Sequence, residues 1–267
     1  MVYFCNKYYL GVEIKTILIL LLFSYSYGVD LHVPEYYQTI QLAIDSAISG
    51  DEILVASGIY NERIDFKGKN ISIIGENKDN TIIDGSEINY LDLVTINSGE
   101  NIDSTLFKNF TIQGFSPIIQ GSSALVINNN SGAVLDSIQI INNNSPGNAP
   151  AIYINDNSYV KISNSIISDN SSGASGGAIY IANSTLDIFY CQISNNSSFQ
   201  SGGAIRSLGS KIIIEESIFN NNITQYSGGS IYANDSEIIS NNTLFYKNES
   251  GNNGGAIYFK NNSSLTL

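Results

Sequence analysis

A short motif returns at a constant spacing in the second half of this 267-residue chain. It reads GGAIY, GGAIR, GGSIY and GGAIY, beginning at Gly176, Gly202, Gly228 and Gly254, a spacing of 26 each time. Upstream, the segments 123–127 and 150–154 keep its apolar pattern at a spacing of 27, without the glycines. A fixed period of this length is the sequence signature of a repeat architecture. The chain therefore contains at least six turns of one structural unit.

Within each repeat, apolar and polar residues alternate in three short runs, which is the period of a β-strand. In one repeat the inward positions are Ile179 with Ile181, Leu186 with Ile188, and Cys191 with Ile193. Similar residues recur in the next coils at constant separation, as expected when each coil pairs in parallel with its neighbour about 4.8 Å away. The pattern predicts an all-β parallel solenoid with about 26 residues per coil.

One asparagine per coil closes the third run, and these asparagines are expected to stack in a column. Stacked amides can hydrogen-bond along the axis as a ladder, and Asn tolerates the left-handed conformation that a sharp corner requires. The predicted structural ladder comprises Asn144, Asn170, Asn196, Asn222 and Asn248.

The segment 38–49 has a helical pattern. Its apolar residues Ile40, Ala43, Ile44, Ala47 and Ile48 lie on one stripe of a helix, with Thr39 as the expected N-cap and Gly50 as the stop. Such a helix would cover the open apolar end of the first coil.

Segment 1–28 has the pattern of a secretory signal peptide. Lys7 and Lys15 precede an apolar run at 17–23, and small residues follow at Ser26 and Gly28. The run is too short to span a bilayer, so no transmembrane segment is expected in the mature chain. We therefore expect a secreted or cell-surface protein.

Three parts are expected along the chain. Residues 1–28 form the signal peptide, 29–52 the N-terminal cap with its amphipathic helix, and 53–267 the coils. The segment 262–267 starts another strand and stops, so the chain is expected to be truncated at its C-terminus.

Two stretches resemble known families of right-handed parallel β-helix proteins. Segment 36–75 resembles the opening coil of pectin-lyase-like proteins, which include the pectin methylesterases. The GGAIY units, together with FNNN at 219–222 and FYKN at 245–248, resemble the GGA(I/L/V) and FxxN repeats of polymorphic outer membrane proteins. The resemblance implies a right-handed parallel β-helix, and the second family implies a secreted or surface-displayed module used in adhesion.

The distribution of charged residues excludes some classes of function. The net charge of -12 argues against binding to nucleic acid, which needs a basic surface. In the regular coils, Asp187 and Glu237 align with no other acid, so no carboxylate pair is expected for acid–base catalysis or for Ca²⁺ binding. The motifs of pectin methylesterases and polygalacturonases are missing, and the single His32 precedes the coils. We expect no catalytic residue, no metal site and no cofactor.

An outward column of the first strand is the candidate binding surface: Tyr153, Tyr180, Arg206, Tyr232 and Tyr258. Stacked rings and a cation–π contact could simply stabilise the sheet. Alternatively, the column could be a platform for sugar rings or for a partner's surface.

The expected function is a non-catalytic module for adhesion that binds surface glycans or another protein. The alternative is a carbohydrate-active enzyme of the pectin-lyase-like group, a methylesterase, lyase or hydrolase acting on acidic polysaccharide.

Two further features concern a secreted chain. Cys5 leaves with the signal peptide, so Cys191 has no disulfide partner and is expected to be a small buried side chain rather than a nucleophile. Asn-x-Ser/Thr sites are abundant, for example at Asn170, Asn183 and Asn222, and some corners would carry glycans in a eukaryotic host.

Overall fold

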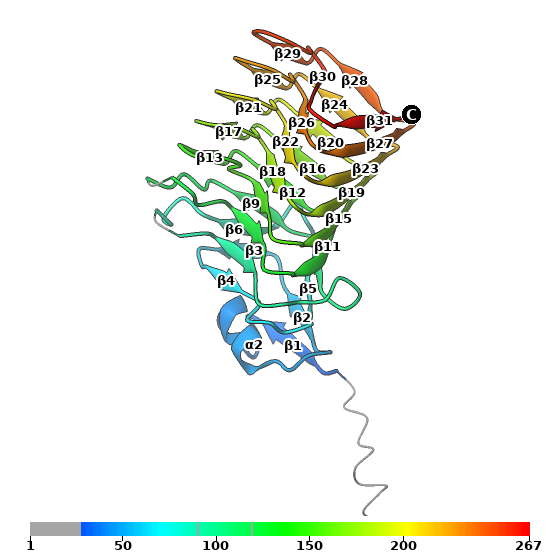
Figure 1. Cartoon of the computed structure of the whole chain (residues 1–267). Helices are drawn as coiled ribbons and strands as arrows, with labels where there is room; N and C mark the ends of the chain where they lie inside the picture. The colour runs from blue at the N-terminus through cyan, green and yellow to red at the C-terminus, as the bar shows by residue number, and fades with distance from the viewer. Residues whose placement is uncertain (1–27, 90, 119) are drawn as a thin grey trace, which may run out of the picture.

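The computed structural model describes residues 28–267 except 90 and 119, so the predicted signal peptide lies almost wholly outside the described residues. The chain is a parallel β-helix in which each coil lies on the preceding one and adds one strand to each sheet (Figure 1). It rises from the N-terminal α2 and β1 to β30 and β31.

The strands form four parallel sheets, which we name A to D. Sheet A contains β1 (Asp30–Val33), β2 (Glu52–Val55), β5 (Ser72–Gly75), β8 (Leu106–Lys108), β11 (Gly132–Asp136), β15 (Tyr159–Ser163), β19 (Thr185–Phe189), β23 (Lys211–Glu215), β27 (Glu237–Asn241) and β31 (Ser264–Thr266). Sheet B contains β3 (Gly58–Tyr60), β6 (Thr81–Asp84), β9 (Thr111–Gln113), β12 (Gln139–Ile141), β16 (Ile166–Ser168), β20 (Gln192–Ser194), β24 (Ile218–Asn220) and β28 (Leu244–Tyr246).

Sheet C contains the strands of the repeated motif: β4 (Ile64–Asp65), β7 (Val94–Ile96), β10 (Leu125–Ile127), β14 (Ile152–Ile154), β18 (Ile179–Ala182), β22 (Ile205–Leu208), β26 (Ile231–Asn234) and β30 (Ile257–Lys260). Sheet D consists of two-residue strands: β13 (Asn144–Ser145), β17 (Ser171–Ser172), β21 (Ser197–Ser198), β25 (Ile223–Thr224) and β29 (Glu249–Ser250). A regular coil therefore runs through sheets C, A, B and D. The sequence pattern predicted the first three and missed sheet D.

The register confirms the predicted stacking of like residues. Ile179 pairs with Ile205, which pairs with Ile231, at the period of the sequence motif. Earlier coils are irregular: Glu52 pairs with Ser72, and Ser72 pairs with Leu106, so one coil is much shorter than the next. The sheets continue through these differences, so the loops absorb the variation in coil length.

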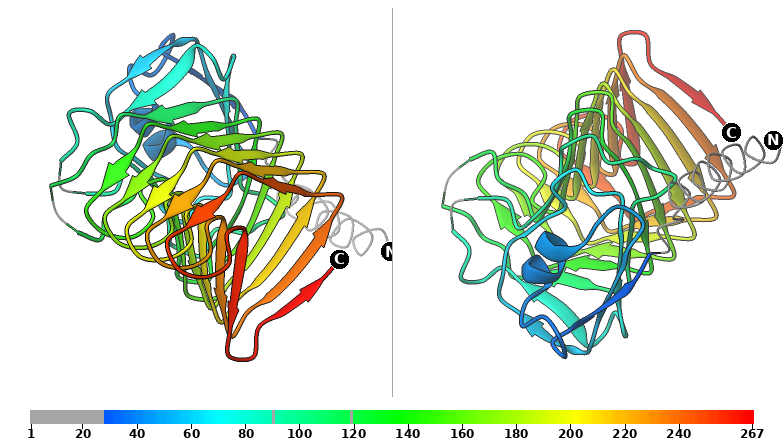
Figure 2. Two further views of the ribbon diagram at one scale, coloured as in Figure 1. Left: turned by 90° about the horizontal axis from the view of Figure 1, so that it is seen from above. Right: turned by 90° about the horizontal axis from the view of Figure 1, so that it is seen from below.

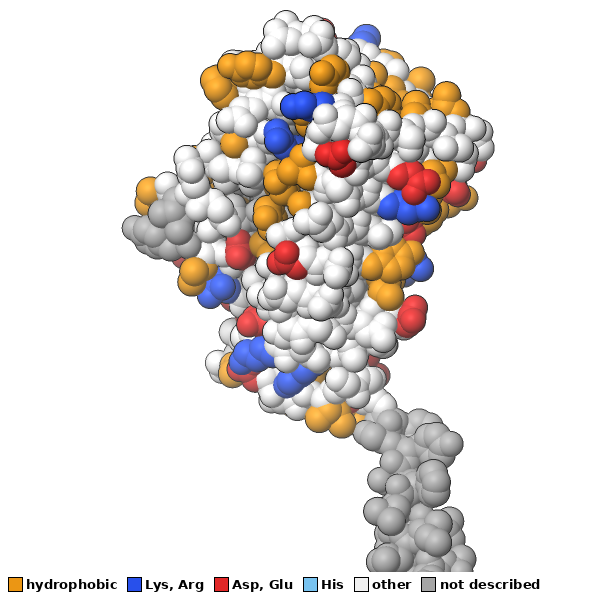
Figure 3. All heavy atoms as spheres, in the orientation of Figure 1, with side chains coloured by type: hydrophobic (Ala, Val, Ile, Leu, Met, Phe, Trp, Pro, Cys, Tyr) orange, Lys and Arg blue, Asp and Glu red, His pale blue; other side chains and the backbone are white. Residues whose placement is uncertain are grey.

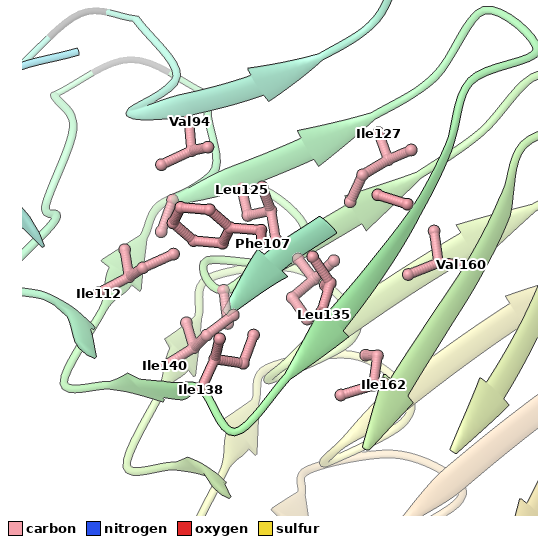
Figure 4. Close-up of a cluster of buried hydrophobic side chains, with 14 of the residues drawn as sticks. Val94, Phe107, Ile112, Leu125, Ile127, Leu135, Ile138, Ile140, Val160 and Ile162 are labelled. Carbon is pink, nitrogen blue, oxygen red and sulfur yellow. The ribbon is translucent and has the colours of Figure 1, made fainter. Parts of the chain in front are cut away.

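The inward columns form one continuous hydrophobic core. Figure 4 shows side chains of successive coils, among them Leu125, Leu135 and Ile140, pointing into the interior. Phe107 stacks on Phe110 with ring centroids 4.5 Å apart. Burial of each large aliphatic side chain contributes about 1.5–3 kcal/mol, so the packing of the columns is the main source of stability.

A short helix, α2 (Ile40–Ser46), lies at the N-terminal end of the solenoid (Figure 2). Its buried residues Ile40, Ala43 and Ile44 face the core, and the helix contacts β1, β2 and β4. Thr39 Oγ1 accepts the Leu42 N–H at 3.1 Å, as expected of an N-cap. The apolar end of the first coil is thus covered as the sequence predicted.

Two details of this end differ from the prediction. The helix ends at Ser46 and does not reach residue 49, because Ala47 has an extended backbone and Lys69 Nζ donates to the carbonyls of Ile44 and Asp45 at 2.6 and 2.9 Å. Moreover, β1 pairs with β2, so sheet A begins before the helix and inside the segment expected to be only a cap.

Each corner of the regular coils holds one residue with a positive φ. Between sheets B and D these residues are Asp169, Asn195, Asn221 and Lys247, with φ of 52–58°. We expected the ladder asparagines themselves to adopt this conformation, and this was wrong: the left-handed residue directly precedes each of them. Its side chain therefore points outward at the corner, while the next side chain points into the coil.

The two glycines of each repeat are required for different reasons. The first, such as Gly202, has a φ of 69°. The second, such as Gly203, packs so closely on the next coil that a Cβ would collide with the carbonyl oxygen of Gly229. Only glycine satisfies both positions, because a Cβ at the first, which also has left-handed backbone, would collide with Ile205 O, and a Cβ at the second would collide with the next coil.

Replacing Gly203 with Ala should therefore lower the free energy of unfolding by about 3 kcal/mol, since the new methyl group meets backbone that cannot move independently. The measurement is the midpoint of thermal unfolding followed by circular dichroism. Gly209→Asn is the control, because Gly209 has a φ of 57° and its column holds Asn183 and Asp235 at equivalent corners. Equal midpoints for the two variants would contradict this explanation of the second glycine.

Candidate binding site

The asparagine ladder runs along the corner between sheets B and D. Asn170 Nδ2 donates to Asn196 Oδ1 at 3.0 Å, and the same bond links Asn196 to Asn222 and Asn222 to Asn248 at 3.1 and 3.0 Å. The first member differs from the prediction. Asn143, not Asn144, donates to Asn170, because this coil is one residue longer than those that follow; Asn144 is exposed at the start of β13.

Every hydrogen-bonding site of a ladder amide is used. The Asn196 Oδ1 accepts the backbone N–H and the amide of Asn170, while its Nδ2 donates to Ile167 O and to Asn222 Oδ1 at 2.9 and 3.1 Å. Asn196 is fully buried. An amide has two donors and two acceptor positions, and only Asn and Gln carry one in the side chain, so any other residue type would leave buried groups unpaired.

Asn196→Asp should destabilise the solenoid by about 3 kcal/mol, because the carboxylate loses both donors and adds a buried charge. Asn195→Asp is the matched control: Asn195 is the exposed corner residue next to it, and the equivalent corner residue one coil earlier is Asp169. Thermal unfolding of both variants tests this. A control variant as destabilised as Asn196→Asp would show that the corner, not the ladder, is sensitive.

The five residues of the predicted column lie in register on sheet C, and we call them the tyrosine stripe: Tyr153, Tyr180, Arg206, Tyr232 and Tyr258. The Tyr153 and Tyr180 rings stack at 5.3 Å with an interplanar angle of 6°, and the Tyr232 and Tyr258 rings at 5.5 Å. The Arg206 guanidinium carbon lies 5.1 Å from the Tyr232 ring centroid. Burial raises the pKa of Tyr153.

This stacking limits what the stripe offers to a ligand. Each ring turns its face towards a neighbouring coil, and the Tyr232 side chain lies between Arg206 and Tyr258 and is only 9% exposed. A sugar that stacks on an aromatic residue needs a free ring face. The stripe thus presents mainly ring edges, which fits the stabilising interpretation, and binding by the stripe stays a prediction.

A groove of about 640 Å³ runs over sheet D, and Asn144 is the one lining residue that was assigned to a column from the sequence. Its lining comes from five successive coils, which extend over about 19 Å at 4.8 Å per coil. It contains Phe199, whose side chain is 48% exposed. The lining residues are Ser116, Pro117, Ile118, Asn144, Ser145, Pro146, Ser171, Ser172, Gly173, Ser197, Ser198, Phe199, Ile223, Thr224 and Gln225.

The groove is uncharged in a chain of net charge -12, because none of its lining residues is Asp, Glu, Lys, Arg or His. It offers hydroxyl and amide groups next to apolar side chains. Figure 3, which shows one face of the molecule, has blue and red side chains scattered over the coils among white and orange ones. Sequence reasoning missed this surface because serine-rich two-residue strands carry no apolar alternation. A repeat of small polar pairs at 144–145, 171–172 and 197–198 was the available signal.

Asp187 pairs in register with Lys161 on sheet A. Asp187 is 5% exposed, and its Oδ2 accepts the Tyr159 hydroxyl at 2.6 Å. Burial and this carboxylate raise the pKa of Tyr159 to about 12. In the earlier coils, burial raises the pKa of Asp92, whose carboxylate accepts the Ser123 N–H at 2.8 Å. Each carboxylate thus accepts a hydrogen bond from within the fold, while Asp187 Oδ1 is buried without a partner.

Two absences can be stated for the part of the chain that the structure describes. Residues 28–267, apart from 90 and 119, contain no group of three or more His, Cys, Asp or Glu side chains placed to hold a metal ion. Over the same residues, no helix has the length and apolar character needed to cross a bilayer.

Cys191 lies in a column with Ser165 and Ser217, at 3% exposure. Its Sγ lies 3.2 Å from Phe189 O, and Ser217 Oγ accepts its backbone N–H at 3.1 Å. Burial raises the pKa of the thiol to about 11. A buried thiol with so high a pKa is a poor nucleophile.

The folded protein should therefore react slowly with a thiol reagent at pH 8, where a pKa of about 11 leaves about one thiolate per thousand thiols. Denaturant should release the full reactivity of Cys191. Cys191→Ser should change the unfolding midpoint little, because serine occupies this column position in the coils on both sides. Rapid labelling of the folded chain would contradict the assignment of Cys191 as structural.

Some of the glycosylation sequons coincide with the ladder. Asn170 and Asn222 are buried, and their amides are engaged in the hydrogen bonds described above, so a glycan at either position is incompatible with the folded chain. Asn183 is exposed at a corner. Its glycosylation stays a prediction.

The repeat is similar to a known repeat family. Three stretches match the Chlamydia polymorphic membrane protein (Chlamydia_PMP) repeat. They are residues 164–182, 216–234 and 239–260. Each contains a strand of sheet B, a ladder asparagine, a strand of sheet D, the glycine pair and a strand of sheet C. This confirms the resemblance seen in the GGAI and FxxN patterns. No curated protein matches the chain significantly in sequence.

Several solved structures are similar in shape. A pectin methylesterase from carrot is 12% identical, with a TM-score of 0.49, and the match covers 89% of each chain. A pectin methylesterase in complex with a hexasaccharide is 12% identical, with a TM-score of 0.48, over 83% of this chain and 81% of that one. A pectin methylesterase from Aspergillus niger is 18% identical, with a TM-score of 0.39, over 90% and 86%.

Proposed function

We propose that this chain is a non-catalytic binding module that acts at a cell surface or outside the cell, in adhesion, with the groove over sheet D as its ligand surface. The observation that carries the proposal is the uncharged groove shared by five coils. The proposed ligand is an uncharged, hydroxyl-rich group of a surface glycan or of a protein, and no cofactor or nucleic acid takes part.

The groove's chemistry supports such a ligand. Hydroxyl and amide side chains both donate and accept hydrogen bonds, and Phe199 adds an exposed ring next to them. The absence of charge among the lining residues disfavours a strongly charged ligand. The name of the matched repeat family refers to membrane proteins, which agrees with a location at a surface.

Rigidity supports the proposal as well. The groove's floor is fixed by the fully bonded asparagine ladder at its border, so the lining side chains are presented in a nearly invariant spacing. A ligand that binds a preformed surface avoids the entropy cost of ordering loops on binding. This is useful in a module that must hold a ligand without transforming it.

The test uses one added charge. Ser197→Lys places an ammonium group in the groove and should weaken binding of the protein to cells or to an immobilised glycan panel at least tenfold, about 1.4 kcal/mol, because the groove has no acid to pair with it. Gln192→Lys is the control: it adds the same charge at an exposed position on β20 of the same coil, outside the groove.

Equal binding by wild type and Ser197→Lys would overturn the assignment of the groove. The purified chain should also release neither methanol nor unsaturated sugar from pectin or polygalacturonate, with or without Ca²⁺. Release that persists through purification would overturn the non-catalytic part of the proposal and favour the enzyme alternative.

A further inference from the structure

Arg206 interrupts a column of tyrosines. The residues in register with it on sheet C are Tyr180 on one side and Tyr232 on the other. Its Nη1 donates to Ser175 Oγ at 2.9 Å, and its guanidinium lies over the Tyr232 ring. Its Nε is buried and makes no hydrogen bond. The N–H donors of the Arg206 guanidinium are therefore only partly hydrogen-bonded.

No acid neutralises this cation. Among the described residues, the ion pairs within 4.0 Å are those of Lys67, Lys108 and Lys211, and none involves Arg206. The chain has 24 acidic residues against 12 basic ones, so its only arginine in the regular coils stands without a counter-charge in an acidic protein. The unpaired Nε–H carries a desolvation cost because it is buried, and the positive charge of the guanidinium is left without a neighbouring acid.

We propose that Arg206 is the centre of an oxyanion site that binds a carboxylate or sulfate group of a ligand lying against sheet C. The planar guanidinium matches such a group through two parallel hydrogen bonds, which a tyrosine at this position could not supply. The proposal concerns a site separate from the groove over sheet D and does not depend on the groove's ligand.

The topology determines how the ligand is recognised. β22 is an interior strand of sheet C, paired with β18 and β26, so its backbone groups are already bonded. A peptide therefore cannot add to this position as an extra strand, which is the usual way in which an extended peptide binds a sheet. The oxyanion would therefore be a side group of the ligand that contacts side chains of sheet C, and Arg206 is the charged side chain among them.

The chain offers a direct spectroscopic test because it contains two arginines, Arg63 and Arg206. Each gives one Nε–H signal in a ¹⁵N NMR spectrum of the full chain. Arg63 Nε donates to Asp92 O at 2.8 Å, so its signal is an internal reference. Titration with sodium acetate or sodium sulfate should shift the Arg206 signal and saturate, with a Kd on the order of 1 mM, while sodium chloride of equal ionic strength should not.

Arg206→Tyr is the variant that keeps the fold, since it gives this position the residue found in the neighbouring coils. It should remove the responsive signal, and its own unfolding midpoint should respond equally to acetate and to chloride. A wild-type Arg206 signal that does not shift, or that shifts identically in chloride, overturns the proposal.

Two small carboxylates then distinguish a sugar ligand from an acidic peptide ligand. Glucuronate presents the carboxylate on a sugar and N-acetylaspartate presents it as an acidic side chain, with glucose as the neutral control. Saturable shifts with either carrier support the site and identify its ligand class. A response to acetate or sulfate but to neither carrier would mean an adventitious ion only, and would overturn Arg206 as a ligand site.

Discussion

Hydrogen bonding between successive coils is the interaction on which the rest of the structure depends. Each strand pairs in parallel with the strand one coil earlier and one coil later, so a residue type at one position meets the same position again about 4.8 Å away. A backbone path that is repeated so closely must turn at the same place in every coil. The left-handed residues at the corners, the close packing of Gly203 on Gly229 and the asparagine ladder are all consequences of this one requirement.

The same requirement explains why so much of the fold was predictable from the sequence. Once the period was recognised, the alternation assigned the inward faces of sheets A, B and C, and the register of Ile179, Ile205 and Ile231 followed directly. The error in the ladder was one of local counting. Asn142, Asn143 and Asn144 are consecutive, and extending the period of the later coils upstream selects the last of them. The register of Gln139 with Ile166 adds one residue to this coil and selects Asn143.

Other features could not be found in this way because long-range contacts determine them. The end of α2 depends on Lys69, which reaches the carbonyls of Ile44 and Asp45 from the following coil. The strands of sheet D have only two residues each and hold no alternating pattern. They exist because the ladder fixes the chain just before them, as Asn196 does before Ser197 and Ser198. A contact between coils thus creates a sheet that local preference would not predict.

Perfect repetition stabilises a solenoid but uses up the groups that could bind a ligand. In the tyrosine stripe, the stacking of Tyr153 on Tyr180 covers ring faces, and in the ladder each amide satisfies its neighbours. The two surfaces that we propose for binding lie where the repetition stops. Phe199 stands among small polar residues in the groove, and Arg206 stands among tyrosines without an acid to pair with. A residue that breaks a column has no identical partner in the adjacent coil and makes other contacts instead, as Phe199 does with the Tyr226 ring and Arg206 with the Tyr232 ring. The departures from the repeat are therefore where the function of such a chain is to be sought.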